Sequence, residues 1–263
     1  MKALLTLFLV FSSCNLYSQY LLSGKEIFTF QDLPKKIAEV KKSSISIEIS
    51  DKNLNSPNLV GSGFVALKKG IYYAVTNYHV IKNIGKDKII LIGLNVEMKK
   101  QYALVEQTYV DEKYDVAVMK MGEVVSIQNI RIDSTLTKPA GVGISMFDTS
   151  ENIIEGSGVI IVGYPLGLGS EYTGNKPVSR IGIVAQGPNN NTNTFLLDCM
   201  ASHGNSGSPV FNEQNQKLIG MVTSFPQDKI YLYDKDDVLR ASLPYNSGIT
   251  ICVTAEMINK IIP

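Results

Sequence analysis

Residues 204–211 read Gly-Asn-Ser-Gly-Ser-Pro-Val-Phe, a polar loop that runs directly into an apolar strand. Glycine adopts backbone dihedral angles that other residues resist, so the glycines at 204 and 207 favour a sharp turn around Ser206 and leave amide groups facing outward. An exposed serine on such a turn is suited to act as a nucleophile, and the amides are suited to stabilise a developing oxyanion. Because this kind of segment is most often an ordinary turn, the hypothesis requires a base and an acid elsewhere in the chain.

The chain contains two histidines, and only one of them is well placed to serve Ser206. His203 lies on the same loop, three residues before the serine, which is awkward for accepting its proton. His79 comes at the end of an apolar strand, and Asp115 stands immediately before another apolar run. A serine nucleophile needs a base within hydrogen-bond reach, and the base needs a third group to hold its tautomer. Since a buried acid is costly unless it is paired, we predict a triad of His79, Asp115 and Ser206.

The order of these residues along the chain discriminates among serine hydrolases. An α/β-hydrolase carries its triad in the order Ser, acid, His and needs a glycine two residues after the serine, where this chain has Ser208. A subtilisin-like enzyme has the order Asp, His, Ser. Asp51 precedes His79 but lies in a polar loop without the expected glycines. Only the chymotrypsin order, His before Asp before Ser, fits the sequence.

Short alternating segments separated by glycine, proline and charged residues dominate the remaining sequence. Residues 44–50 read Ser-Ile-Ser-Ile-Glu-Ile-Ser, which is the period of a half-buried strand, and Lys68-Lys69-Gly70 between two apolar runs is a hairpin signal. The strands fall into two series, which favours an all-β fold of barrels. The expected strands are 44–50, 63–67, 71–76, 88–94, 102–111 and 115–120, then 157–163, 179–186, 194–200, 209–211, 217–223 and 248–253. Two helices are expected at 32–41 and 254–262, the second of them capped by Thr254.

Composition excludes several classes of protein. The chain has 263 residues, of which 44% are hydrophobic and 19% charged, with a formal net charge of +1. It is too apolar for a disordered chain, and it lacks the basic excess of a general nucleic-acid binder. With two histidines and no cluster of zinc-ligand spacing, we expect neither a metal site nor another cofactor. The length suits one large domain or two small ones around a shared interface.

The N-terminus has the pattern of a secretory signal peptide. Met1-Lys2 is followed by the apolar run 3–11 and then by small and polar residues to Gln19, so we expect residues 1–19 to be cleaved after Ser18 or Gln19 and the chain to be exported, either secreted or periplasmic. Nine residues span ~14 Å as a helix, short of the ~30 Å hydrocarbon core, so no membrane span is expected. A buried N-terminal strand is the alternative. Phe11-Ser12-Ser13-Cys14 loosely resembles a lipobox, which leaves a lipid anchor at Cys14 as a second option.

Cys199 and Cys252 are the cysteines that would remain after such a cleavage. An oxidising compartment permits a disulfide between them. The alternative is that both are small buried side chains with free thiols. The sequence leaves both options open.

Motifs in five segments carry a resemblance to one protein family. Thr-Asn-Tyr-His-Val at 76–80 is similar to the histidine motif of the bacterial chymotrypsin-like (trypsin-like) serine peptidases. Asp-Val-Ala-Val-Met-Lys at 115–120 is similar to the Asp-Leu-Ala-Val-Leu-Lys pattern of the high-temperature-requirement proteases, as are Gly-Tyr-Pro-Leu-Gly at 163–167 and Ser-Arg-Ile-Gly-Ile-Val at 179–184. The serine segment 204–212 is closer to the staphylococcal glutamyl endopeptidases. The resemblance covers most of the chain beyond the N-terminal region.

This resemblance implies two six-stranded antiparallel β-barrels with the active site between them. An N-terminal extension at 20–42 would precede a first barrel at 43–138 and a second barrel with a short C-terminal helix at 139–263. Ser206 would attack the scissile carbonyl, and the backbone N–H groups of Gly204 and Ser206 would form the oxyanion hole. The animal digestive members carry an acid at the position of Asn205, so the resemblance argues against their type of zymogen activation.

The resemblance also places a pocket for the residue before the cleaved bond. Its walls would be Met200 to His203 and the strand Gly220-Met221-Val222-Thr223-Ser224. Met200 stands about where trypsin-type enzymes carry an acid, so cleavage after Lys or Arg is disfavoured. The histidine that glutamyl endopeptidases use in the following strand is missing at Val222, although His203 is a conceivable substitute. We therefore expect a preference for small or aliphatic residues. The expected pocket residues are Met200, His203, Met221, Val222 and Thr223.

These observations favour an exported serine endopeptidase that acts through an acyl-enzyme on a protein or peptide substrate. The alternative is a catalytically inactive protease-fold protein that binds peptides. A regulated stress protease of the high-temperature-requirement type would need a C-terminal peptide-binding domain, for which the sequence up to Pro263 leaves no room. The segment 225–247 is long for a pocket wall, and we expect it to cap the pocket, bind a partner or form a solvated loop. The oligomeric state stays open.

Overall fold

A computed structural model of the chain describes residues 32–53, 57–96, 99–126, 131–132, 139–167, 176–234 and 237–263. Residues 36–263 form one compact unit. The expected signal peptide and the lipobox cysteine lie outside the described residues, as does most of the expected N-terminal extension. The described part of that extension contains helix α2 (Leu33–Lys41), which agrees with the helix expected at 32–41. No helix within the described ranges is both long enough and apolar enough to cross a bilayer.

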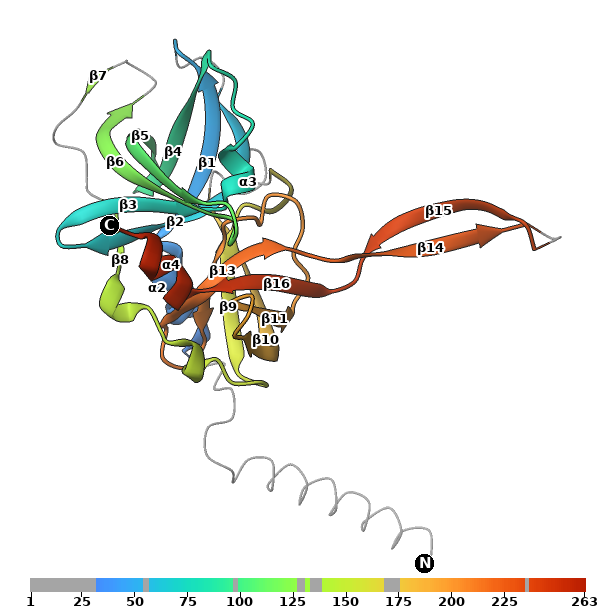
Figure 1. The fold of residues 1–263 in the computed structure, drawn as a ribbon. Helices are drawn as coiled ribbons and strands as arrows, with labels where there is room; N and C mark the ends of the chain where they lie inside the picture. The colour runs from blue at the N-terminus through green and yellow to red at the C-terminus, as the bar shows by residue number, and fades with distance from the viewer. Residues whose placement is uncertain are drawn as a thin grey trace, which may run out of the picture. The chain divides into compact units, whose positions relative to one another are not determined.

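The first barrel is a closed antiparallel sheet in the order β1-β4-β5-β6-β3-β2, with β1 and β2 pairing to close it (Figure 1). A short strand, β7 (Arg131–Ile132), adds to β6. Another, β8 (Val142–Gly143), pairs with β2 in parallel, so the chain still contacts the first barrel beyond residue 138. The six barrel strands are β1 (Ser44–Asp51), β2 (Asn58–Lys68), β3 (Ile71–Thr76), β4 (Lys88–Val96), β5 (Lys99–Asp111) and β6 (Val116–Ser126).

The expectation of a half-buried first strand was wrong. Ile45 and Ile47 enter the core of the first barrel, but Ser44, Ser46 and Glu48 are buried as well. The polar side chains of β1 are satisfied internally: the Ser46 hydroxyl donates to Glu48 Oε1 at 2.6 Å. The sequence of β1 therefore alternates between polar and apolar residues although both faces of the strand are buried, because serine side chains are small enough to be covered.

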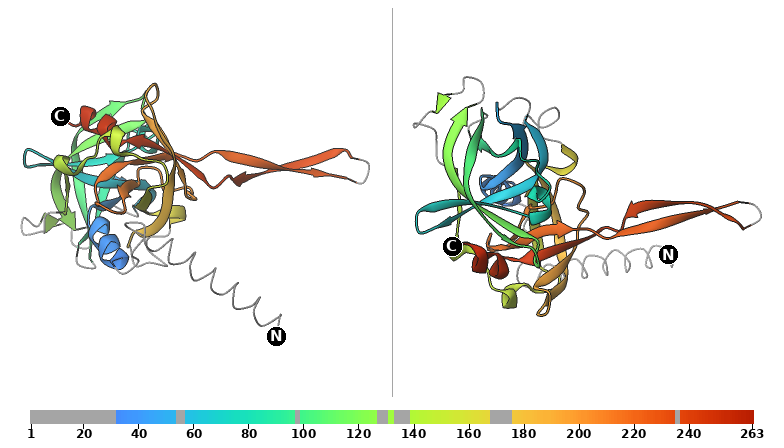
Figure 2. Two further views of the ribbon diagram at one scale, coloured as in Figure 1. Left: turned by 90° about the horizontal axis from the view of Figure 1, so that it is seen from below. Right: turned by 45° about the horizontal axis from the view of Figure 1, so that its top comes forward.

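The second barrel is also closed, in the order β10-β11-β16-β13-β12-β9. Its core holds Val159, Ile161, Val184, Phe195 and Leu197, each almost fully buried. Together the two closed barrels make the predicted all-β, chymotrypsin-like fold (Figure 2). The strands are β9 (Gly158–Gly163), β10 (Val178–Asn189), β11 (Thr194–Asp198), β12 (Pro209–Asn212), β13 (Leu218–Ser224) and β16 (Ile249–Thr254).

Helices are few and short among the described residues. Helix α4 (Ala255–Ile261) follows β16 directly, and the Thr254 hydroxyl accepts the Met257 N–H, which is the predicted N-cap. Helix α3 (Tyr78–Ile81) follows β3 in the first barrel. Three 3-10 helices lie in connections: η1 (Ile144–Met146), η2 (Ser150–Asn152) and η3 (Pro165–Gly167).

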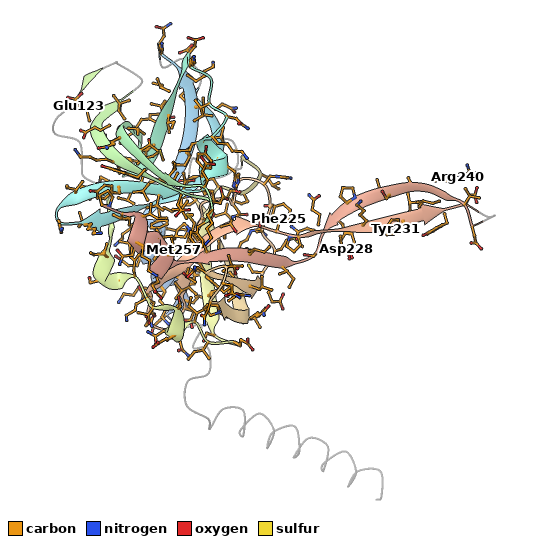
Figure 3. All side chains as sticks on the ribbon, in the orientation of Figure 1. Glu123, Phe225, Asp228, Tyr231, Arg240 and Met257 are labelled. Atoms are coloured by element: carbon orange, nitrogen blue, oxygen red, sulfur yellow. The ribbon has the colours of Figure 1, made fainter. Side chains whose placement is uncertain are left out.

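Residues 227–246 form a β-hairpin of strands β14 (Gln227–Tyr233) and β15 (Leu239–Asn246). It continues β13 and β16 out of the second barrel and projects away from both barrels (Figures 1 and 3). Nearly all of its described residues are exposed. The segment is thus an ordered two-stranded ribbon and not the solvated loop that was one of the expectations.

The two cysteines of the second barrel, Cys199 and Cys252, are buried free thiols. Burial raises the pKa of the Cys199 thiol, and it raises the pKa of the Cys252 thiol well above its ordinary value. Of the two options that the sequence left open, the structure therefore has buried unbridged side chains.

Candidate active site

His79 and Asp115 are brought together by the connections that follow β3 and precede β6. His79 is the second residue of α3, and Asn77, in an extended conformation, links the end of β3 at Thr76 to this helix. Asp115 has a φ of +54°, a left-handed conformation that Asp tolerates better than most residues. Its carbonyl accepts the Asn77 amide at 2.9 Å and the Tyr78 N–H at 3.2 Å. These bonds fix the backbone of the acid against the start of the helix that carries the histidine.

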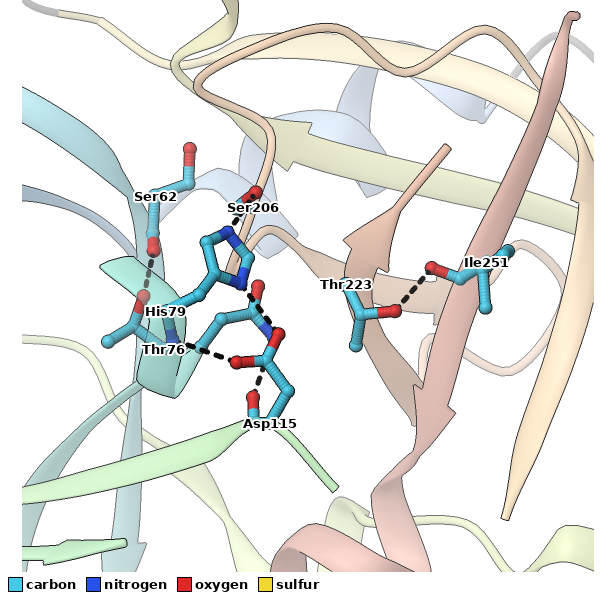
Figure 4. Close-up of polar contacts among 8 residues, drawn as sticks. Ser62, Thr76, His79, Asp115, Ser206, Thr223 and Ile251 are labelled. Carbon is cyan, nitrogen blue, oxygen red and sulfur yellow. Dashed lines mark hydrogen bonds and ion pairs between the residues drawn. The ribbon is translucent and has the colours of Figure 1, made fainter. Parts of the chain in front are cut away.

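The side chains of Asp115, His79 and Ser206 form a continuous hydrogen-bonded chain (Figure 4). Asp115 Oδ2 lies 2.6 Å from His79 Nδ1, and Asp115 Oδ1 accepts the His79 backbone N–H at 2.8 Å. On the other side of the ring, His79 Nε2 lies 2.9 Å from Ser206 Oγ. The carboxylate therefore holds the ring with Nε2 directed at the serine, which is the geometry needed to take up and return a proton.

The loop that carries Ser206 is stabilised by the buried side chain of Asn205. Asn205 Oδ1 accepts the Ser202 N–H at 3.1 Å and the Ser202 hydroxyl at 3.2 Å. Its Nδ2 donates to Ser208 Oγ at 3.3 Å. The amide thus makes its hydrogen bonds within the loop.

Both barrels hold the backbone around Ser206. From the first barrel, the Ser62 N–H donates to the Ser206 carbonyl at 2.9 Å, and the Thr76 hydroxyl fixes the Ser62 carbonyl at 2.7 Å (Figure 4). From the second barrel, the carbonyl of Val222 accepts the Gly207 N–H at 3.0 Å. Gly207 has a φ of +86°, and a Cβ there would lie 2.0 Å from the Ser62 carbonyl oxygen. Only glycine fits this approach between the barrels.

Gly204 orients the backbone just before the serine. Its φ is +88°, and an added Cβ would lie 2.4 Å from the Tyr164 carbonyl oxygen. The preceding carbonyl, that of His203, accepts the Leu166 N–H at 2.6 Å. Among the described residues, no acceptor pairs with the backbone N–H of Gly204 or of Ser206. Two unused donors therefore stand on the loop of the hydroxyl, as an oxyanion hole requires.

A pocket of about 660 Å³ opens beside the three side chains. Two of the residues predicted to line it, His203 and Thr223, do so. The Thr223 hydroxyl donates to the Ile251 carbonyl at 3.1 Å, tying its strand to β16 (Figure 4). The remaining lining residues are His79, Lys113, Tyr114, Asp115, Asn191, Thr192, Thr194, Ser206, Ser224, Phe225 and Gln227.

Three predicted pocket residues lie elsewhere. Met221 is fully buried, and Val222 belongs to the core of the second barrel. Met200 is 54% exposed and does not line the pocket. None of these three residues lines this pocket, and for them a contact with substrate stays a prediction.

Phe225 is the most informative residue that the sequence reasoning missed. Its ring meets the ring of His203 edge-on, with 5.4 Å between the centroids. Both rings line the pocket, so their contact closes off part of it. Phe225 directly follows the predicted wall strand, and extending that strand by one residue would have identified it. Asn191 and Thr192 lie in the turn before the expected strand 194–200, and Thr194 begins that strand, so none of the three indicated a pocket.

Within the described residues, no group of three His, Cys, Asp or Glu side chains is arranged to hold a metal ion. The described site brings together a hydroxyl, an imidazole, a carboxylate and two backbone N–H groups.

Comparison with protein families matches residues 61–221 to the trypsin-like peptidase domain. A Rickettsia prowazekii protein named "Probable periplasmic serine endoprotease DegP-like" is 31% identical over 195 residues, covering 73% of this chain and 31% of that protein. A Rickettsia conorii protein of the same name is 30% identical over 210 residues, covering 78% of this chain and 37% of that protein. The chain thus spans about a third of the length of these relatives.

Solved structures share the fold at low sequence identity. The HtrA-type protease AlgW with a tripeptide has a TM-score of 0.58 at 17% identity, covering 87% of this chain and 61% of that one. The MamO protease domain from Magnetospirillum magneticum has a TM-score of 0.53 at 17% identity, covering 85% of this chain and 97% of that one.

Proposed function

The chain belongs to the trypsin-like peptidase family, and we propose that it is an exported serine endopeptidase that cleaves peptide bonds with His79, Asp115 and Ser206. One observation carries the proposal: the unbroken hydrogen-bonded chain from the carboxylate through the imidazole to the hydroxyl, at 2.6 and 2.9 Å. A fold alone supports many functions, but this arrangement is specific to nucleophilic catalysis by serine.

In the proposed mechanism, Ser206 Oγ attacks the carbonyl carbon of the scissile bond while His79 Nε2 takes up the hydroxyl proton. Asp115 holds the ring in the tautomer with a proton on Nδ1 and stabilises the imidazolium that forms. The N–H groups of Gly204 and Ser206 donate to the oxyanion of the tetrahedral intermediate. His79 then protonates the leaving amine, and the acyl-enzyme remains. In the second half-reaction, His79 takes up a proton from water while the water attacks the acyl carbonyl, and it returns a proton to Ser206 Oγ as the ester bond breaks.

We propose that the enzyme prefers a small or aliphatic residue before the cleaved bond. The contact between His203 and Phe225 leaves less depth for a large side chain. Apart from Asp115, no acid lines the pocket among the described residues, so a buried Lys or Arg would lack its own counter-charge. A preference based on apolar size is broad, because one methylene changes selectivity by only about 1–3 kcal/mol.

Export is proposed from the N-terminal sequence and from the relatives. Residues 1–19 have the charged start, apolar run and polar exit of a signal peptide. The two Rickettsia proteins are both named as periplasmic. Sequencing the N-terminus of the protein recovered from the cell envelope or medium tests this: a start after Ser18 or Gln19 supports cleavage, and a lipidated start at Cys14 supports the anchored alternative.

Hydrolysis of unfolded casein tests the proposed activity. We expect cleavage by the wild type and by Ser224→Ala, which removes another hydroxyl from the same pocket, but no cleavage by Ser206→Ala. Equal cleavage by all three variants would show that Ser206 is not the nucleophile. Tight binding of peptides without any cleavage would instead support the inactive binding protein.

A further inference from the structure

The hairpin of β14 and β15 exposes an unusual amount of apolar surface. Within the described chain these two strands pair only with each other, and they extend clear of both barrels (Figures 1 and 3). Eight large apolar side chains on or beside the strands are 44–60% exposed: Ile230, Tyr231, Leu232, Tyr233, Val238, Leu239, Leu243 and Tyr245. A lone two-stranded ribbon is at best marginally stable in water, so a covering partner is expected.

One face of the ribbon carries a continuous apolar set. Ile230 lies opposite Leu243, and Leu232 lies opposite Ala241. Because side chains alternate along a strand, Ile230, Leu232 and Leu243 share one face with Tyr245 at the base. We call Ile230, Leu232, Leu243 and Tyr245 the apolar hairpin face.

Polar contacts lie at the two ends of the ribbon. At the base, the Tyr245 hydroxyl donates to Asp228 Oδ2 at 2.9 Å. The Lys229 backbone N–H and, to a smaller extent, this hydroxyl lower the pKa of the Asp228 carboxyl. Toward the tip, Arg240 Nε donates to Asp234 Oδ2 at 2.7 Å. The centre of the face is left without charge, so it is suited to meet another apolar surface.

The apolar hairpin face supplies much of the apolar area that a stable interface needs. At about 150–250 Å² for a large side chain, and with roughly half of each exposed, its four side chains present apolar surface on the order of 400 Å². Each partner of a standard specific interface contributes about 800 Å², of which about 65% is apolar in homodimers, or roughly 500 Å².

We propose that this chain forms a two-fold symmetric dimer in which the apolar hairpin face of one copy packs against the same face of a second copy. A two-fold interface brings the same patch of both subunits together, so the patch must complement itself. An uncharged apolar centre does so. The ribbon from 227 to 246 carries four acids and three bases, so two copies do not repel each other strongly. Figure 2 shows that the barrels leave the ribbon accessible along its length.

Neighbouring positions of β15 supply a matched test. Leu243 lies on the apolar hairpin face, whereas Ser242 points to the opposite face, opposite Tyr231. All variants carry Ser206→Ala to prevent self-cleavage and Cys14→Ser to remove the N-terminal thiol. Sedimentation velocity over about 1–100 μM, the range that suits an interface of this size, measures the assembly. We expect a dimer for the protein that carries only these two background substitutions and for Ser242→Glu in the same background. For Leu243→Glu we expect a dissociation constant of the dimer at least ~100-fold higher, because the new carboxylate would be buried without a partner.

Disulfide cross-linking gives a second readout that does not depend on breaking the interface. Under mild oxidation, Leu243→Cys should form a covalent dimer and Ser242→Cys should not, while Cys199 and Cys252 stay buried. A chain that is monomeric throughout, an assembly other than a dimer, or cross-linking that is equal for the two cysteine variants would overturn the proposal. Binding of an unfolded polypeptide by the hairpin of a monomer would also overturn it.

Discussion

Replacing Gly204 by alanine tests whether the backbone of the serine loop takes part in catalysis. The residue has a φ of +88°, and the new Cβ would lie 2.4 Å from the Tyr164 carbonyl oxygen. A left-handed conformation costs a non-glycine residue about 1–2 kcal/mol. Because the clash is with backbone and not with a mobile side chain, the loop must move, and the Gly204 N–H moves with it.

The expected loss of activity follows from the proposed oxyanion hole. Removing one such donor from a comparable enzyme lowers kcat by about 10²–10³, or about 2.7–4 kcal/mol. We therefore expect Gly204→Ala to reduce kcat by about 100- to 1000-fold with little change in KM, since the donor acts mainly in the transition state. The free energy of unfolding should fall by about 1–3 kcal/mol.

Gly156 provides the control. It has a similar φ of +83°, but nothing lies within 4 Å of a Cβ added there. Gly156→Ala should therefore lower stability by about 1 kcal/mol and leave kcat unchanged. Initial rates on an unfolded protein substrate, together with urea unfolding, measure both effects. If Gly204→Ala keeps a kcat within about threefold of Gly156→Ala, the backbone of this loop does not stabilise the transition state as argued.

Three further predictions concern the pocket, the C-terminal helix and the cysteines. Phe225→Ala should raise kcat/KM for large relative to small residues before the cut by about 10-fold or more, as read from a peptide-library digest; an unchanged preference would remove Phe225 from the pocket wall. Hydrogen bonds from Ser150 lower the pKa of Glu256, so their stabilisation is present above the ordinary value of 4.5 and is lost as pH falls through the lower folded pKa. Ser150→Ala should thus lower the free energy of unfolding by up to about 1 kcal/mol at pH 7 and have little effect near pH 3; equal effects at both pH values would contradict this. Cys199 and Cys252 should resist alkylation at neutral pH until the chain unfolds, and a disulfide found by mass spectrometry would contradict the burial of free thiols.

The barrels were predictable because their strands carry local signals. Alternation and glycine-rich turns marked the segments, and the observed strands overlap every expected one. Chain order then restricted the serine hydrolase architectures to one, in which the segments of His79, Asp115 and Ser206 meet. The pattern at 44–50 correctly predicted a strand but not its burial on both faces. Serine hydroxyls are small enough to be buried when they have hydrogen-bond partners.

The hairpin and the pocket lining depend on information that is not local. Residues 228–233 alternate weakly, and the cluster of acids at 234–237 is typical of a surface loop, so nothing in the sequence distinguished an ordered ribbon from a solvated segment. In the pocket wall, the register of β13 against β16 shifts between Val222 and Ser224. A single shift of this kind decides which side chain faces the pocket and which enters the core.

The central claim is that His79 activates Ser206 for attack on an acyl group. It is tested most directly by reaction with a fluorophosphonate, followed by intact-mass measurement and peptide mapping of the adduct. We expect one adduct, located on Ser206, with labelling slowed at least ~10³-fold in His79→Ala and unchanged in His203→Ala. An unlabelled protein, an adduct on another residue, or equal labelling of His79→Ala would contradict the account.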